Sequence, residues 1–145
     1  MIKISYTTRM PVGADELWRA LTDFAASPRW QPAVIEERCE PAGPPEVGSR
    51  IFQARRFMGR RVEGWNEVDA VRPPMYLHSR GDGVVTEYRL VPAGAGTELT
   101  FTIELAAIPW LARPVVRLVL RRDVSARFRR LRALLAAGGW AQVQC

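Results

Sequence analysis

The last third of the chain carries an apolar residue at every third or fourth position, and this pattern constrains the fold more than any other. The stripe extends over roughly five helical turns. Its members are Val116, Val119, Leu120, Val124, Phe128, Leu131, Leu134 and Leu135. Pro114 suits the first turn of a helix, and Gly138-Gly139 suits its end. The sequence therefore predicts one long amphipathic helix, whose apolar face must pack against another layer.

The rest of the chain is dominated by strand periodicity. Ile2–Met10 alternates apolar and polar residues, which is typical of a half-buried strand. Helical spacing predicts short helices at Ala14–Asp23 and Ala26–Trp30, the second ending before Pro32. Six further strand-length segments follow, separated by short turns. They are Val34–Glu40, Ser49–Phe57, Arg60–Val71, Met75–Arg80, Val84–Val91 and Thr97–Leu105.

The predicted order is strand, two short helices, six strands and a long helix, which makes an α+β fold with a seven-stranded curved antiparallel sheet. Only the C-terminal helix is long enough to cover one face of that sheet. A bent sheet contacts a single helix along part of its length, so we expect a cavity closed by the two short helices. A chain of 145 residues suits a single domain, 1–145.

The composition excludes several functional classes. One His and two Cys are too few for a familiar metal site, so no metal is expected. Cys39 and Cys145 are far apart, which favours free thiols in a reducing compartment and predicts a cytoplasmic protein. No segment has the pattern of a signal peptide, and charged and proline residues interrupt every apolar stretch that approaches the length of a membrane span.

The strand before Pro73 carries the most informative candidates for chemistry. If Trp65 faces the cavity, then a period of two sends Glu67, Asp69 and Val71 the same way. Two carboxylates on an apolar wall would have raised pKa values and could act as acid and base. The opposite register sends both carboxylates to solvent and Val68 inward, and the pattern leaves both registers open.

Two further residues are candidates for proton transfer or ligand contact. Tyr88 alternates with Thr86 and Leu90 and is expected to point inward, where its hydroxyl would bind a ligand carbonyl or serve the core. His78 is either a proton donor near neutral pH or an exposed strand residue. Other expected ligand-contacting residues are Trp18 and Trp30 on the short helices and Ile51, Leu99, Phe101 and Ile103 on strands.

Several local strings occur at separations that resemble one known family. They are ADELWRALTDFAASPRWQP (14–32), EVGSRI (46–51), WNEVDAVRPP (65–74), GAGTELT (94–100) and RFRRLRALLAA (127–137). Together they resemble the START/Bet v 1-like (SRPBCC) superfamily, closest to its polyketide cyclase/dehydrase-like branch. The resemblance implies the helix-grip fold, a small hydrophobic or amphipathic ligand between sheet and helix, and neither cofactor nor metal. It also implies that some members catalyse aldol closure and dehydration of polyketides.

This chain departs from the cyclase pattern at one position. Cyclases of the family often place an Arg two residues before the proline that closes this strand, where this chain has Val71. A cation for an enolate would then have to come from Arg55 or Arg56, although both are expected at the surface.

The net charge of +6 is concentrated on the last helix. Seven arginines, at 117, 121, 122, 127, 129, 130 and 132, are predicted to lie off the apolar stripe. They form either a solvated face or a docking face for an acidic carrier protein. Nucleic acid is not expected, because no aromatic residues alternate with the arginines to stack bases.

Three functional hypotheses follow, and the oligomeric state is not predicted. The first is a domain that binds a small hydrophobic or aromatic molecule, polyketide- or lipid-like. The second is a polyketide cyclase or dehydratase that uses Glu67, Asp69, Tyr88 or His78. The third is an interaction module that meets an acidic partner through its basic helix.

Overall fold

The computed structural model describes residues 1–138 and 140. Within them lie all the predicted strands and helices, with ends shifted by at most two residues. The elements are β1 (Ile2–Met10), α1 (Ala14–Thr22), the 3-10 helix η1 (Phe24–Arg29), β2 (Val34–Glu40), β3 (Arg50–Phe57), β4 (Arg60–Arg72), β5 (Tyr76–Gly81), β6 (Val84–Ala93), β7 (Gly96–Leu105) and α2 (Arg113–Ala136).

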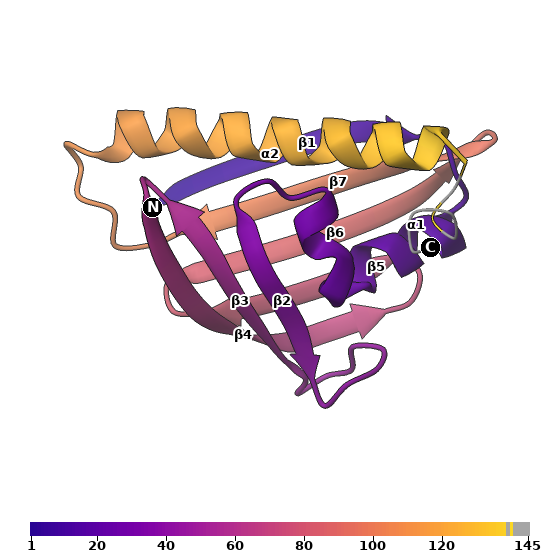
Figure 1. Ribbon diagram of the computed structural model, residues 1–145, viewed down its shortest axis with the longest axis horizontal. Helices are drawn as coiled ribbons and strands as arrows, with labels where there is room; N and C mark the ends of the chain where they lie inside the picture. The colour runs from indigo at the N-terminus through magenta and orange to yellow at the C-terminus, as the bar shows by residue number, and fades with distance from the viewer. Residues whose placement is uncertain (139, 141–145) are drawn as a thin grey trace.

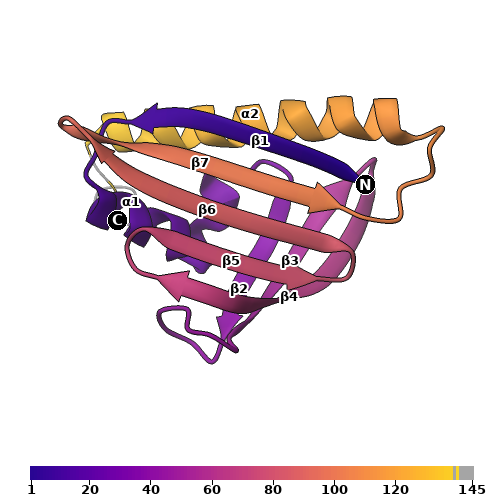
Figure 2. The same ribbon diagram turned by 180° about the vertical axis from the view of Figure 1, so that it is seen from behind.

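The strands form one antiparallel sheet of seven, in the order β1-β7-β6-β5-β4-β3-β2. Strands β2 to β7 are a meander, and β1 returns to pair with β7 from Ile2 opposite Leu105 to Met10 opposite Thr97. The sheet bends strongly, so that β2 to β4 run obliquely to β5 to β7 (Figures 1 and 2). This arrangement confirms the predicted α+β helix-grip fold.

The turn between β3 and β4 shows how local sequence sets the strand register. Met58 and Gly59 both have positive φ, at 51° and 81°, as a two-residue type I′ turn requires. Such a turn matches the right-handed twist of its flanking strands. It pairs Phe57 with Arg60 and so fixes which side chains of β3 and β4 face inward.

Helix α2 lies along the concave side of the sheet, beside β1 (Figure 1). Its buried residues Leu120, Val124, Phe128, Leu131 and Leu135 follow the predicted stripe. The Phe128 ring lies 5.3 to 5.7 Å from the rings of Tyr6, Trp30 and Phe101. Gly138 follows the helix with φ of 154°, and Gly139, the other residue predicted to end it, lies outside the described residues.

A β-bulge in β4 changes which of its residues face the core. The register with β5 shifts between Val68, opposite Ser79, and Ala70, opposite His78, so Asp69 is the extra residue. Val68 is fully buried before the bulge, and Val71 packs on the core after it. The bulge therefore places Val68 and Val71 on one face, although three positions separate them.

Two remaining predictions concern the cysteines and the membrane. Cys39 is a buried free thiol, and Cys145 lies outside the described residues. No helix in the described part of the chain combines the length and apolarity needed to cross a bilayer.

Candidate functional site

A cavity of about 70 Å³ lies between the sheet, the α1–η1 segment and α2. By the measure of 10–15 Å³ for each water molecule, it has room for roughly five waters or for one end of a small ligand. The lining comes from residues far apart in sequence. They are Leu21, Phe24, Gln31, Glu37, Ile51, Gln53, Arg55, Asn66, Leu77, Ser79, Val84, Thr86, Tyr88, Phe101, Ile103 and Arg127.

Among the described residues that line the cavity, Glu37 of β2 is the one carboxylate. Ser27 donates a hydrogen bond of 2.5 Å to Glu37 Oε1, and Gln53 Nε2 donates one of 2.6 Å to Oε2. Burial raises the pKa of Glu37, and these two hydrogen bonds together with the charges of Arg127 and Arg55 only partly offset that effect. The carboxyl group is thus held in one orientation and takes up a proton more readily than an exposed glutamate.

Two arginines share one aspartate beside the cavity. Asp123 Oδ2 of α2 accepts hydrogen bonds from Arg127 Nη2 at 2.5 Å and from Arg55 Nη2 of β3 at 3.3 Å. The Arg127 side chain is only 5% exposed, and the Arg55 and Asp123 side chains are 23% and 15% exposed. Burial and the neighbouring charge of Arg127 lower the pKa of Arg55. This tie connects the sheet to the helix at the edge of the cavity.

Tyr88 of β6 lies against the same charges. Its ring centroid is 4.9 Å from that of Phe101, and the Arg127 guanidinium lies 5.6 Å from the Phe101 ring centroid. Burial raises the pKa of Tyr88, while Arg127 acts in the opposite direction. The phenol therefore stays protonated at neutral pH and is able to donate a hydrogen bond.

Some polar atoms around the cavity have no protein partner. Among the described residues, Gln31 Oε1, Arg55 Nε and Arg127 Nε are buried without a hydrogen bond. A buried polar atom without a partner costs free energy, roughly 1–3 kcal/mol each. Two unused donors and one unused acceptor at one cavity are the features that a bound polar group would satisfy.

Four of the predicted residues lie on the opposite face of the sheet. Trp65 packs on Phe52 with centroids 5.1 Å apart, and the Arg50 guanidinium lies 4.6 Å from its ring centroid. Glu67 and Asp69 are exposed, and His78 Nδ1 shares a hydrogen bond with Asp69 Oδ1 there. The inward facing predicted for Trp65, Glu67 and Asp69 is therefore wrong: strand β4 adopts the alternative register before its bulge.

The outer-face carboxylate Asp69 is held by two hydrogen-bond partners, His78 and Arg80. Besides His78, Arg80 Nε donates to Asp69 Oδ2 at 2.8 Å. Burial tends to raise the pKa of Asp69, but the bonds from His78 and Arg80 outweigh it and lower the pKa. Asp69 and His78 thus form a hydrogen-bonded pair on the outside of the sheet and not an acid–base pair in the cavity.

The predicted ligand-contacting residues divide into lining and core. Tyr88, Ile51, Thr86, Phe101 and Ile103 line the cavity. Four others pack in the core and do not line the cavity: Trp30, Val71, Leu90 and Leu99. The ring centroids of Trp30 and Phe128 are 5.6 Å apart.

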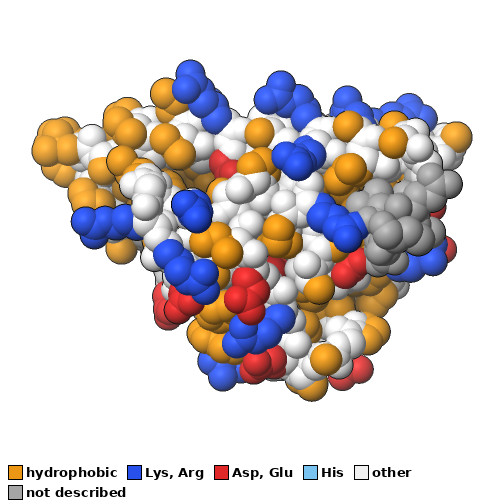
Figure 3. Space-filling view, viewed as in Figure 1, with side chains coloured by type: hydrophobic (Ala, Val, Ile, Leu, Met, Phe, Trp, Pro, Cys, Tyr) orange, Lys and Arg blue, Asp and Glu red, His pale blue; other side chains and the backbone are white. Residues whose placement is uncertain are grey.

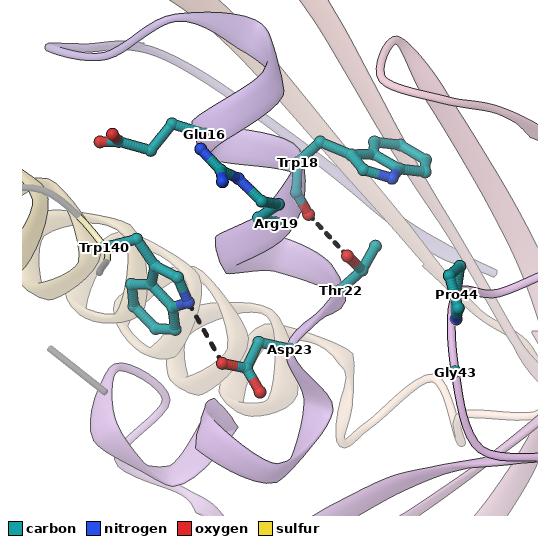
Figure 4. Close-up of a pocket in the computed structure, with 8 residues that line it drawn as sticks. All are labelled: Glu16, Trp18, Arg19, Thr22, Asp23, Gly43, Pro44 and Trp140. Atoms are coloured by element: carbon teal, nitrogen blue, oxygen red, sulfur yellow. Dashed lines mark hydrogen bonds between the residues drawn. The ribbon is translucent and has the colours of Figure 1, made fainter. Parts of the chain in front are cut away.

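Trp18 borders a different hollow, of about 390 Å³, on the outer side of α1 (Figure 4). There Trp140 Nε1 donates to Asp23 Oδ2 at 3.2 Å, and Thr22 Oγ1 donates to the Trp18 carbonyl at 2.8 Å. This hollow is open to solvent. The interior cavity instead gathers buried charges with shifted pKa values, which is typical of functional sites, so we place the candidate site in the interior.

Sequence reasoning missed the polar side of this cavity. Glu37 stands on a strand whose other face is charged, and Gln53 stands on a strand with arginines on both faces. Arg127 was predicted to lie off the apolar stripe of the last helix. The prediction for Arg127 is wrong: it lies three residues after Val124 and four before Leu131, within the buried stripe. Arg55, expected at the surface, alternates with Ile51 and Gln53 along β3 and faces the cavity with them. That alternation was the available signal.

Residues 1–136 match the family described as polyketide cyclase/dehydrase and lipid transport. The chain belongs to this family. Its fold agrees with solved members of the wider START/Bet v 1-like superfamily, which confirms the resemblance seen in the sequence. The family and the fold are consistent with a ligand-binding domain of this type, and the particular ligand and any catalysis have to be argued from the cavity.

Solved structures show the same fold in other organisms. A protein from Rhodobacter sphaeroides has a TM-score of 0.76 with 24% identity, and the match covers 94% of this chain and 93% of that one. A START superfamily protein from Mycobacterium smegmatis has a TM-score of 0.75 with 16% identity, covering 93% and 97%. Ara h 8.0201 has a TM-score of 0.68 with 14% identity, covering 94% and 99%.

One curated protein shares a local likeness. Cytochrome P450 71D10 from Glycine max is 32% identical over 94 residues, which are 63% of this chain and 18% of that protein. The chain spans less than a fifth of that relative's length, and the likeness carries no argument about function.

Proposed function

We propose that this protein binds a small amphipathic molecule in the cavity between sheet and α2, with an oxygen-bearing end against Arg55, Tyr88 and Arg127. The observation that carries the proposal is the pair of buried guanidinium Nε atoms without partners at the cavity. A keto or carboxylate oxygen would accept hydrogen bonds from them, and charge-assisted bonds of this kind are the stronger ones.

The remaining lining supports an apolar body for the ligand. The same lining has an apolar part, made of Phe24, Ile51, Leu77, Phe101 and Ile103. A hydrophobic or aromatic portion would be buried there at about 25 cal/mol per Å² of surface removed from water. Pockets for drug-sized ligands measure 300–1,000 Å³, so a polyketide- or lipid-sized molecule requires the cavity to expand.

Native mass spectrometry of the freshly purified protein tests this proposal. We expect a bound small molecule in the wild type, with occupancy reduced at least tenfold in Arg127→Met. Arg129→Met is the matched control, because Arg129 is an exposed arginine of the same helix. Equal occupancy in both variants would contradict the proposed role of Arg127.

If nothing co-purifies, titration with benzoate and with benzyl alcohol replaces the endogenous molecule. Both probes carry an apolar ring and an oxygen-bearing end, and only benzoate is an anion. Wild-type protein is expected to bind benzoate more tightly, and the preference should vanish in Arg127→Met. Failure of both probes to bind would count against the cavity as a binding site.

One observation favours acid–base catalysis as a second candidate function. Glu37 lies in the cavity with a raised pKa, and Tyr88 offers a phenolic proton on the same lining. A carboxyl group poised nearer neutrality is suited to move protons in an aldol closure or dehydration. Glu37→Gln should then retain ligand binding and abolish conversion of a β-keto substrate, whereas unchanged product formation would exclude this role.

A further inference from the structure

The connection from β7 into α2 exposes an unusual concentration of large apolar side chains. Trp110 and Leu111 are each 73% exposed, and Val115 and Leu118 on the first turns of α2 are 53% and 51% exposed. We call these four residues the apolar tip. Trp and Leu at this exposure remain in contact with water unless something covers them, and contiguous patches of this kind mark interaction sites.

The tip is held in place by its own backbone. Ala106 N donates to Gly83 O at 2.8 Å, and Ala112 N donates to Pro109 O at 2.9 Å, which closes a turn around Trp110 and Leu111. Ile108 packs on the core just before this turn and anchors it. The chain therefore partly buries Ile108 and leaves Trp110 and Leu111 exposed.

Basic residues surround the apolar tip. Arg113, Arg117, Arg121 and Arg122 all fall within the first ten residues of α2. The one acid of the helix, Asp123, is bound to Arg55 and Arg127. Figure 3 shows orange apolar side chains at the left end of the molecule, where α2 begins in Figure 1, and blue basic side chains along the helix.

The shape of this end favours one kind of occupant. In Figures 1 and 2 the β7–α2 connection projects beyond the rest of the molecule, so the apolar tip is a protrusion and not a groove. A second copy of the chain would bring two arginine-rich surfaces together, and like charges across an interface are unfavourable. An anionic lipid surface accepts both a protruding apolar tip and its basic surroundings.

We propose that the apolar tip, with Arg113, Arg117, Arg121 and Arg122, docks this protein onto the surface of anionic lipid bilayers. Trp110 would sit at the headgroup level, where the amphipathic indole is favoured. The arginines would contact lipid phosphates, each contributing about a fivefold gain in affinity near an anionic surface. Docking is peripheral and does not depend on the cavity holding the ligand proposed above.

Vesicle binding of the full chain tests this inference. We expect cosedimentation with vesicles of phosphatidylglycerol and phosphatidylcholine in equal amounts, weaker binding at raised salt, and no binding to phosphatidylcholine alone. Tryptophan emission should shift to the blue on binding, and Trp110→Phe should remove most of the shift, because Trp18, Trp30 and Trp140 are buried and Trp65 packs on Phe52 in the sheet.

Two double variants separate the apolar and basic contributions. Trp110→Ser with Leu111→Ser should weaken binding at least about tenfold through lost apolar burial. Arg121→Glu with Arg122→Glu should weaken it about 25-fold or more. Two control variants should bind like the wild type. Val47→Ser changes an apolar residue that is 68% exposed and lies outside the apolar tip, and Arg50→Glu changes an arginine of β3.

Three outcomes would overturn the proposal. Equal affinity for neutral and anionic vesicles would refute the role of the arginines. Binding that survives the Trp110 and Leu111 double variant would refute the role of the apolar tip. A dimer in light scattering that dissociates in the same double variant would assign the tip to a second copy of this chain. Circular dichroism of every variant confirms that its fold is retained.

Discussion

Asp123→Asn is expected to destabilise the fold more than the loss of an ordinary ion pair does. The carboxylate is the shared acceptor of Arg127 at 2.5 Å and Arg55 at 3.3 Å, and the Arg127 side chain is only 5% exposed. The substitution keeps the size of the side chain and leaves two buried cations without this counter-ion.

The magnitude follows from the cost of an uncompensated buried charge. Removing one partner of a buried ion pair costs about 3–5 kcal/mol, and the residual exposure of the Arg55 and Asp123 side chains, 23% and 15%, places the expected loss near the lower end, at about 3 kcal/mol. Arg127→Met should cost less, because Asp123 then keeps Arg55 as a partner. The two substitutions together should cost less than the sum of their separate effects.

Urea unfolding at neutral pH measures these differences. Glu63→Gln is the matched control, because Glu63 and Arg61 pair at 2.8 Å with side chains 52% and 49% exposed. Its loss should stay below about 1 kcal/mol, as for other surface pairs. If Asp123→Asn costs no more than Glu63→Gln, then the shared carboxylate does not stabilise the charged cluster and the reasoning is refuted.

Two further predictions concern Glu37 and the sheet. Because the pKa of Glu37 is raised on folding, the free energy of unfolding should fall as pH rises through the interval from about 4.3 to the raised value. Glu37→Gln should remove this pH dependence of the free energy of unfolding, and Glu67→Gln, at an exposed residue, should leave it unchanged. The same pH dependence in both variants would contradict the assignment to Glu37. Gly81→Ala should destabilise by about 1–3 kcal/mol, since a Cβ there would meet Trp65 O at 2.1 Å. Gly64→Ala, where nothing lies within 4 Å, should change thermal stability little.

The fold was predictable because the chain has two clear periodicities, period two in the strand segments and steps of three and four in the last helix. Alternation along β1 and steps of three and four along α2 each report a single buried face. Short turns between consecutive strands leave antiparallel pairing as the simple solution. These signals depend on local sequence and on burial, and both can be read from the order of residue types.

The charged half of the site was not predictable in the same way. A buried Arg or Glu is stable only because of partners that other elements supply, as Asp123 on α2 does for Arg55 on β3. The bulge at Asp69 could not be predicted either, since an extra residue in a strand shifts the alternation of its faces without changing the residue types. Period two left both registers of this strand open, and the one that placed Trp65 inward sent Glu67 and Asp69 to the wrong face with it.

The pairing of β1 with β7 also has a consequence for synthesis. Residue 2 lies opposite residue 105, so β1 stays without its sheet partner until the whole meander up to β7 has been synthesised. Loop closure over this separation must follow completion of the β2–β7 meander. An alternating apolar strand that waits unpaired is a hazard for aggregation. The nascent chain is therefore at its most vulnerable just before β7 is complete, and a ribosome stalled at that point would present β1 to any other strand edge nearby.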